Sequence, residues 1–324
     1  MEGAYYNGQY LNRLERLGYS QAEIDNKLES TFEEMFYGPE GVRLCHCAGP
    51  DMMYIEDTGN HDVRTEGMSY AMMFCVQMNR QKEFDCLWRW VVTHMYLTEG
   101  ENAGYFAWSC HTDGSKNSDG PAPDGEEFFA MSLFFAANRW GSGEGVLDYA
   151  SWARRILHAC VHKGEEAGSG FPMWNPENHL IKFVPNCEFT DPSYHLPHFY
   201  ELFALWSDEC DRPFWHAAAA ASRQYLRKAC HVRTGLSAEY AEYDGRHDWF
   251  FSDAYRTLGN IALDAQWFGD KDGWAQETAA HIQQFFEEKE HGQTNGIYLI
   301  DGTPVEGNAL HPVGLLATIA QGSG

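Results

Sequence analysis

The spacing of the residues at every second predicted helix start is the feature that most constrains the fold of this chain. These residues are Glu66, Asp124, Asp191, Asp253 and His311, separated by 58, 67, 62 and 58 positions. A period of about sixty residues predicts a repeat of helical hairpins, arranged as an array or a closed ring. In such a ring the inner helices run in the same direction, so their N-termini gather at one end. We therefore expect four carboxyl groups and a histidine around one shared cleft.

Helical periodicity of the apolar residues dominates the chain, and strand-like alternation is scarce. The pattern predicts helices at 20–36, 67–79, 81–97, 127–140, 148–163, 193–207, 212–230, 254–268, 273–289 and 312–320. The connections are long and rich in Gly, Pro, Asn and Asp, and connections of that length in a compact protein usually carry function. No low-complexity linker divides the chain, so we expect a single all-α domain over residues 1–324.

The chain is strongly acidic, with 23 Lys and Arg against 47 Asp and Glu and a formal net charge of −24. Nucleic-acid binding depends on basic side chains that neutralise phosphates, so we expect neither nucleic acid nor an anionic membrane as a partner. The charge favours a neutral or cationic substrate. Aromatic residues make up 15% of the chain, which suits sugar binding and an aromatic core equally. Trp108, Trp174 and Trp249 fall in predicted loops, either as stacking platforms or as loop anchors.

The sequence shows no basic segment followed by an apolar stretch at its start, and no run of about 18 apolar residues predicts a membrane span. The nine cysteines are odd in number and scattered through apolar segments, which favours reduced thiols in the cytoplasm. Cys45-His46-Cys47 lacks a second ligand pair at zinc spacing, and the pair His195 and His198 lacks a third ligand. We expect no metal site and no cofactor.

Two of the acids have surroundings suited to opposite roles in glycoside hydrolysis, which needs one protonated and one ionised carboxyl group. Arg256 follows Asp253 by three positions, close enough on a helix to keep Asp253 ionised as a general base. Burial among apolar neighbours would raise the pKa of Glu66 and suit a general acid, although Arg64 and the helix dipole oppose this. Tyr194 begins the third inner helix, where its phenol either holds a water against Asp253 or packs in the core. For each acid taken singly, helix capping is an alternative explanation.

Three segments resemble motifs of glycoside hydrolase family 8. "TEGMSYAMM" resembles the family's acid-bearing segment, "SDAYR" its base-bearing motif, and "APDGEEFFAMSLFFAANRW" its signature, an Ala-x-Asp-Gly-acidic run leading into a helix. Pro123 and Glu126 depart from the commonest signature, and Pro123 is shared with family members that release xylose from the reducing end of short oligosaccharides. "GYFAWSC", "DPSYHLPHFYELF" and "LHPVGL" are similar to the same subgroup. The resemblance extends over nearly the whole chain.

The resemblance implies an (α/α)6 barrel of helical hairpins and inverting hydrolysis of xylo-oligosaccharides. It implies that Glu66 is the general acid, that Asp253 is the general base, and that Asp124 organises the distorted sugar beside the cleaved bond. It also implies that Tyr194 helps to hold the attacking water and that His311 lines the reducing-end side of the cleft. We also expect Arg64, Arg256, Trp108, Trp174 and Glu239 to bind the substrate.

A sixth inner helix is expected about sixty residues after His311, beyond the last of the 324 residues, so the sixth hairpin is predicted to be missing from this chain. Three other functions stay open: an endo-acting glucanase, xylanase or chitosanase of the same family, a sugar epimerase with catalytic histidines, or a sugar-binding protein without catalysis. A cationic chitosan would suit the negative charge. The sequence does not indicate an oligomeric state.

Overall fold

The computed structural model describes residues 2–165 and 169–323, and this part of the chain is mostly helical. Its α-helices are α1 (Ala4–Asn7), α2 (Arg13–Arg16), α3 (Gln21–Tyr37), α4 (Thr65–Gln77), α5 (Gln81–Trp90), α6 (Pro123–Trp140), α7 (Tyr149–His162), α8 (Pro197–Trp206), α9 (Arg212–Ala229), α10 (Arg256–Phe268), α11 (Trp274–Glu290) and α12 (Pro312–Gly322). Shorter turns are the π-helical η1 (Val91–Met95) and the 3-10 turns η2 (Gly145–Leu147), η3 (Pro192–Tyr194), η4 (Glu209–Asp211) and η5 (Ser252–Tyr255).

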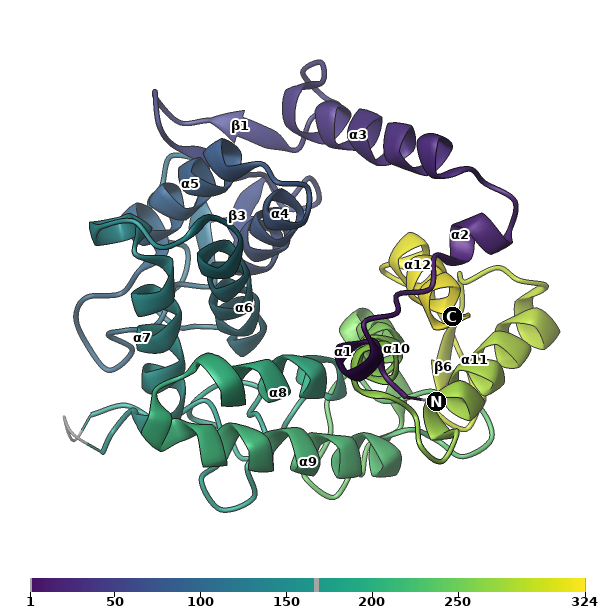
Figure 1. Ribbon diagram of the computed structural model, residues 1–324. Helices are drawn as coiled ribbons and strands as arrows, with labels where there is room; N and C mark the ends of the chain where they lie inside the picture. The colour runs from purple at the N-terminus through teal and green to yellow at the C-terminus, as the bar shows by residue number, and fades with distance from the viewer. Residues whose placement is uncertain (1, 166–168, 324) are drawn as a thin grey trace.

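The helices are arranged as hairpins around a common centre. In Figure 1, α4, α6, α8, α10 and α12 lie on the inner side of the ring, while α5, α7, α9 and α11 lie outside them. Local sequence signals fix where several of these helices begin. The first position of three inner helices is a proline: Pro123, Pro197 and Pro312. Proline has no N–H, and at this position it costs no hydrogen bond, because the first N–H groups of a helix have no partner within the helix. The inner helices therefore have defined N-termini, as the sixty-residue repeat predicts.

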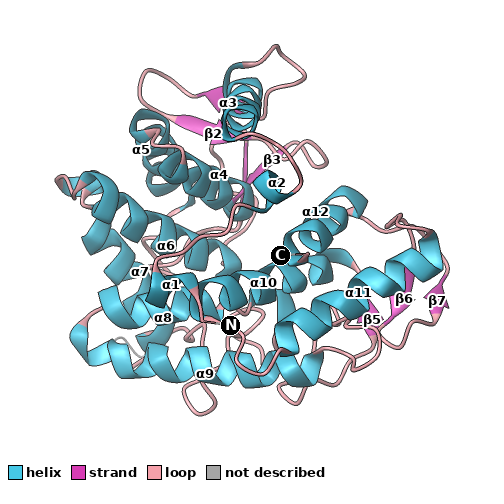
Figure 2. Cartoon of the chain, turned by 45° about the vertical axis from the view of Figure 1, so that its right-hand side comes forward, coloured by secondary structure: helices cyan, strands magenta, loops and turns pink. Residues whose placement is uncertain are grey.

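Short strands fill several of the long connections. β1 (Cys45–Cys47) pairs with β2 (Met53–Ile55), β3 (Asp62–Arg64) pairs with β4 (Ser109–His111), and β5 (Trp249–Phe250), β6 (Ile297–Leu299) and β7 (Pro304–Val305) form a three-stranded antiparallel sheet. Figure 2 shows them as small magenta arrows beside the helices. The all-α expectation is incomplete at this point, because strands of two or three residues are too short to show an alternating pattern in the sequence.

Three predicted helices are divided or change helix type in the structure, whereas the others differ in where they begin or end. The helix predicted at 81–97 ends at Trp90 and continues as one π-helical turn. The helix predicted at 193–207 is divided into η3 and α8, because Pro197 restricts the preceding residue, Leu196, to non-helical backbone angles. The one predicted at 254–268 starts as the 3-10 turn η5 before α10. The last two changes re-aim the side chains at the helix starts.

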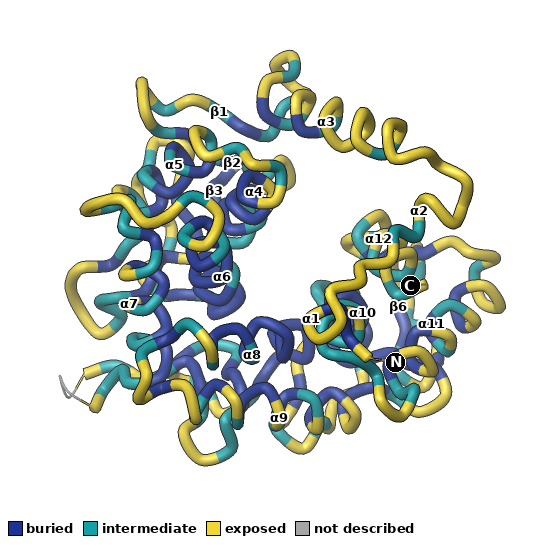
Figure 3. Tube along the Cα trace, in the orientation of Figure 1, coloured by how far each residue is buried: buried dark blue, intermediate teal, exposed yellow. Residues whose placement is uncertain are grey.

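The core lies between the two layers of helices and is rich in aromatic side chains. Trp88, Phe106 and Phe129 are fully buried together, with ring centroids 5.1–5.9 Å apart. Figure 3 shows much of α4, α6 and α8 in dark blue and the largely exposed α3 in yellow. The aromatic content therefore serves the core to a large extent. All nine cysteines are free, and six of them are buried.

The described residues contribute five inner helices to the ring. The prediction that the sixth hairpin of an (α/α)6 barrel is missing stays a prediction. On α12, Val313 is 80% exposed and Leu316 is 51% exposed, so part of the apolar face of this helix is uncovered in the structure. Within residues 2–165 and 169–323, no helix combines the length and the apolar character needed to cross a membrane.

Candidate active site

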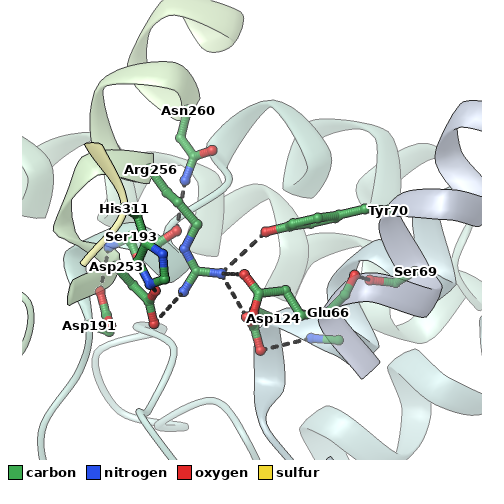
Figure 4. Close-up of polar contacts among 11 residues, drawn as sticks. Glu66, Ser69, Tyr70, Asp124, Asp191, Ser193, Asp253, Arg256, Asn260 and His311 are labelled. Atoms are coloured by element: carbon green, nitrogen blue, oxygen red, sulfur yellow. Dashed lines mark hydrogen bonds and ion pairs between the residues drawn. The ribbon is translucent and has the colours of Figure 1, made fainter. Parts of the chain in front are cut away.

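Arg256, the first residue of α10, binds three carboxyl groups with one guanidinium. Its Nη1 donates to Glu66 Oε1 at 2.9 Å and to Asp124 Oδ2 at 2.8 Å, and its Nη2 lies 3.3 Å from Asp253 Oδ2. Figure 4 shows the carboxyl groups converging on this side chain. They come from α4, α6 and η5, which are far apart in the sequence. The gathering of acids at the helix starts is thus confirmed for three of the four.

The 3-10 turn explains why Asp253 and Arg256 meet. Residues three apart eclipse one another in a 3-10 turn, so Asp253 in η5 and Arg256, the residue directly after η5, point in the same direction. The predicted pairing of Asp253 with Arg256 is confirmed. That the same guanidinium also reaches Glu66 and Asp124 was not predicted. Arg256 was expected to bind substrate, but its side chain is only 9% exposed. The buried guanidinium therefore holds the carboxyl groups in place by ion pairs.

The start of α4 packs closely against the start of α6. The sequence predicted that Glu66 and Asp124 lie before the first residues of their helices. In the structure each is the second residue of its helix. A Cβ added at Gly125 would lie 2.5 Å from Thr65 Cβ, so only glycine permits this approach. The close contact brings the first turns of both helices to the same guanidinium.

Solvent exposure separates the four charged groups into two layers. The side chains of Glu66 and Asp253 are 33% and 35% exposed, whereas those of Asp124 and Arg256 are each 9% exposed. A substrate entering from solvent therefore meets Glu66 and Asp253 first. Asp124 lies beneath them, where it accepts a hydrogen bond from the Gly125 N–H at 3.0 Å.

The electrostatic environment of Glu66 favours its protonated form. Burial raises its pKa to about 7; Arg256 and Arg64 oppose this shift, while the negative charges of Asp124 and Asp253 add to it. Burial also raises the pKa of Asp124 against the opposing effect of Arg256. The sequence left open whether burial outweighs Arg64 and the helix dipole, and in the structure burial has the larger effect. A carboxyl group with a pKa near neutrality can donate a proton at physiological pH.

Two tyrosines complete the surroundings of Arg256. The phenol oxygen of Tyr70 accepts from Arg256 Nη1 at 3.2 Å. Tyr70 was not predicted as a site residue, although it lies four positions after Glu66 and therefore shares its helix face. The ring of Tyr194 lies 5.5 Å from the Arg256 guanidinium carbon, and burial raises its pKa, so its phenol keeps its proton. The arrangement brings Tyr194 to the same cluster, as expected.

Asp191 differs from the other acids at the helix starts. Its carboxylate accepts from the Ser193 N–H at 2.7 Å and caps η3. Its side chain is buried, and burial raises its pKa to about 8. The capping explanation therefore holds for this acid, whereas the helix caps of α4 and α6 are Arg64 and Ala122.

Two further acids in the first turns of α6 are fully buried. Glu126 accepts from the Phe106 N–H at 2.9 Å, and Glu127 lies 2.5 Å from the Tyr200 phenol oxygen. Burial raises the pKa of both well above the usual range of a glutamate. Tyr200 also donates to the Tyr194 carbonyl at 3.1 Å. A protonated Glu127 satisfies both contacts at once, by donating to Tyr200 while Tyr200 donates to Tyr194.

Trp108 and Arg64 form a small platform beside Glu66. Trp108 is 38% exposed, and the Arg64 guanidinium carbon lies 5.3 Å from its ring centroid. Asp57 and Asp62 each hold Arg64 Nε at 3.0 Å. The exposure of Trp108 agrees with its predicted role as a stacking surface. Arg64, expected to bind substrate, is held by two carboxylates against this tryptophan.

Trp174 does not have the position that the sequence predicted. It is 1% exposed and packs against Trp215 and Tyr200, with ring centroids 4.9 and 5.6 Å away. The expectation that it binds substrate is wrong, because the loop that carries it folds back onto the core. Trp249 stacks on Phe251 at 4.9 Å. Of the three tryptophans predicted in loops, Trp108 is the one that is exposed.

The other polar residues singled out from the sequence divide between core and cleft. His195 bonds to Thr190 and Ser222 through its two ring nitrogens, at 2.9 and 2.8 Å, and is a core histidine. His198 is equally buried, and its ring edge meets Trp267. Glu239 has a pKa raised by burial and by the charge of Asp253, which marks it as a neighbour of that acid.

His311 lies beside the general-base candidate. Its Nε2 is 3.9 Å from Asp253 Oδ1, and its ring centroid is 5.6 Å from that of Tyr255. Its side chain is 48% exposed and makes no capping hydrogen bond to α12. The imidazole is therefore available at the cleft, and the capping explanation does not account for it.

The pocket that opens on Glu66 has a volume of about 250 Å3 and is lined by Arg64, Glu66 and Tyr70 among others. A larger pocket of about 500 Å3 is lined by residues of α9, α10 and α11, including Arg223 and Asp264. We place the candidate active site at the smaller pocket, because it is lined by Glu66, one of the two exposed acids of the Arg256 cluster.

A ring of helical hairpins with two accessible carboxyl groups at its helix starts has the pair of acids that glycoside hydrolysis needs. The sequence model described as glycosyl hydrolases family 8 matches residues 19–318, and the chain belongs to this family. It is a glycoside hydrolase.

Comparison with individual proteins narrows the likeness. The chain is 55% identical to a reducing end xylose-releasing exo-oligoxylanase of Halalkalibacterium halodurans, over 99% of this chain and 84% of the relative. It superposes on the structure of Rex8A from Paenibacillus barcinonensis complexed with xylose, with a TM-score of 0.96 and 54% identity, over 99% of this chain and 87% of the other. Endoglucanase 2 of Ruminiclostridium josui is 25% identical over 90% of this chain and 61% of its own length.

Proposed function

We propose that this protein hydrolyses short xylo-oligosaccharides with inversion and releases xylose from their reducing end. The observation that carries the proposal is the Arg256 cluster, in which one guanidinium holds two solvent-accessible carboxyl groups, Glu66 and Asp253. Relatives more than 50% identical are named for this activity, whereas the endoglucanase is far less similar.

In the proposed reaction Glu66 is the general acid. Its raised pKa keeps it protonated near neutral pH, so it can give its proton to the glycosidic oxygen as the bond breaks. The carboxylate that remains accepts from Arg256 Nη1, and a charge-assisted hydrogen bond is stronger than a neutral one. Arg256 therefore stabilises Glu66 after the proton has left.

Asp253 is the proposed general base. It removes a proton from a water that attacks the anomeric carbon from the face opposite the leaving group, which inverts the configuration. An inverting pair needs carboxyl groups about 6.5–9.5 Å apart, with room for that water. The Tyr194 phenol is proposed to help orient the water, and Asp124 to bind the distorted sugar from below. Arg256 forms an ion pair with Asp253, while the Asp253 side chain stays 35% exposed to solvent.

The reducing-end specificity is assigned to His311. Its exposed imidazole lies at the Asp253 side of the cleft and can hydrogen-bond the free anomeric hydroxyl of the terminal xylose. Pro312 fixes the backbone directly after it at the start of α12. A site that hydrogen-bonds a substrate group rejects analogues without it, because its own polar atoms are then left unpaired.

Hydrolysis of xylotriose and of xylotriitol, followed by chromatography, tests this function. We expect xylose and xylobiose from xylotriose and no product from xylotriitol, whose terminal unit has no anomeric hydroxyl. The variant His311→Ala is expected to narrow the rate ratio between the two substrates more than it lowers the rate on xylotriose. Equal parent rates on both, or internal cleavage of polymeric xylan, would instead assign an endo-acting function.

Two broader features belong to the same proposal. We infer that the sixth hairpin of the family barrel is missing from residues 1–324, a view supported by the uncovered apolar side chains of α12. We also infer a reducing compartment such as the cytoplasm, since nine free cysteines suit such surroundings. Xylo-oligosaccharide is the proposed binding partner.

A further inference from the structure

Away from the Arg256 cluster, two histidines on α7 converge on one buried aspartate. His158 and His162 are four positions apart and therefore lie on one face of the helix, with ring centroids 4.6 Å apart. Asp211, at the end of η4, has a side chain that is 4% exposed. Its Oδ1 lies 2.7 Å from His162 Nε2, and its Oδ2 lies 3.8 Å from His158 Nδ1.

We propose that His158, His162 and Asp211 form a binding site for a divalent transition-metal ion such as Zn2+. One ligand atom from each residue lies within 4.8 Å of the others. Zinc ligands at about 2.0–2.2 Å from the ion lie about 3.4 Å apart in a tetrahedral site. The more exposed His158 must therefore move closer by a change of rotamer, and the 2.7 Å contact between His162 and Asp211 must widen to admit the ion. Two imidazole nitrogens and one carboxylate oxygen form a ligand set that zinc uses in proteins.

A second carboxylate supports the orientation of His162. Glu165 Oε2 lies 2.9 Å from His162 Nδ1, on the side of the ring opposite Asp211. Metal-binding histidines commonly have their other nitrogen held in this way, which fixes the tautomer and aims the ligating nitrogen at the ion. Glu165 thus contacts Nδ1 of His162, and Nε2 on the other side of the ring faces Asp211 and is the nitrogen that would bind the ion.

The ordinary explanation is an ion pair of His162 with the two carboxylates. It accounts for His162, while His158 places a second imidazole nitrogen 3.8 Å from the same buried carboxylate. Nitrogen ligands also distinguish the ions that would bind, because Mg2+ and Ca2+ prefer oxygen. A bound transition metal would join α7 to the turn before α9, and so connect two neighbouring hairpins of the ring (Figure 1).

Zinc binding should be measured in a Cys47→Ser/Cys210→Ser background, because these two exposed thiols could bind zinc themselves. Calorimetric titration with ZnCl2 is expected to show one equivalent of tight binding. Zinc at about 100 times Kd should raise the Tm by about 5 °C, because the ion binds only the folded site. MgCl2 and CaCl2 should leave the Tm unchanged.

The variants His158→Ala and His162→Ala should weaken zinc binding at least about tenfold, the scale of losing one strong ligand interaction. His158 is 42% exposed, so its removal should leave the protein folded. His216→Ala, which removes a 75% exposed histidine of α9, is the matched control and should bind zinc like the background. Unchanged affinity and stoichiometry in His158→Ala, or an equal effect of CaCl2, would overturn the proposal. Because no sugar or turnover is involved, the outcome is independent of the proposed hydrolysis.

Discussion

Glu66 determines the pH range over which the proposed reaction can run. Its pKa is raised to about 7, chiefly by burial, and the reaction needs its protonated form. We therefore expect kcat/KM on xylotriose to fall as pH rises above about 7. Glu66→Gln should lower kcat by about 10²–10⁴-fold, as should Asp253→Asn, and Glu66→Gln should also remove the alkaline decline. A parent profile that stays flat to pH 9 would contradict this assignment.

Glu127 provides a test of the buried acids that does not depend on catalysis. Its folded pKa is raised above the unfolded value, so its contribution to stability is present at low pH and is lost as pH rises. We therefore expect the Tm of Glu127→Gln minus the Tm of the parent to increase from pH 5 to pH 8, by about 2 °C or more. The exposed Glu34→Gln is the control and should show no such trend. A constant difference between Glu127→Gln and the parent across this range would mean that Glu127 is ionised in the fold.

At the scale of elements, the contact of Gly125 with Thr65 sets the distance between α4 and α6. A methyl group at Gly125 would meet Thr65 Cβ at 2.5 Å and push the two helix starts apart. Gly125→Ala should lower stability by about 1–3 kcal/mol. It should also reduce kcat by up to about 10²-fold, because it displaces Glu66 and Asp124.

Gly67→Ala is the matched control for this effect. It adds a methyl group in the same helix turn as Glu66, but at 3.4 Å from the nearest Ile55 carbon, which is an ordinary contact. Denaturant unfolding and initial rates should therefore leave Gly67→Ala close to the parent. If Gly125→Ala behaves like Gly67→Ala in both measurements, the close packing of α4 on α6 does not position the acids.

Much of the architecture at this scale could be predicted from the sequence, because the helical period and the spacing of helix starts are properties of the chain itself. The convergence of Glu66, Asp124 and Asp253 followed from that spacing. The three-way binding of Arg256 did not, since it depends on the 3-10 turn before α10. Trp174 was misjudged for a related reason. Whether a loop tryptophan faces solvent or folds onto Trp215 is decided by tertiary packing.

At the scale of the whole molecule, the nine cysteines should differ sharply in reactivity. Cys47 and Cys210 are exposed, while six of the others are buried. Titration with a thiol reagent should find nine thiols in denaturant without reductant. In the native protein two should react fast, and the buried ones should react slowly, because attack needs access to the sulfur. Far fewer than nine thiols in denaturant would show that disulfides form in the native protein.

The ring as a whole brings acids from three different hairpins to one guanidinium, and the central claim is that they act as an inverting pair. The most direct test follows the hydrolysis of xylotriose by NMR, with the anomeric signals of the new reducing end resolved before mutarotation. Water attacking a β-linked xylose from the opposite face should first give the α anomer of xylobiose. Initial release of the β anomer would contradict the claim, because it would require Asp253 or Glu66 to act as a nucleophile in a retaining mechanism.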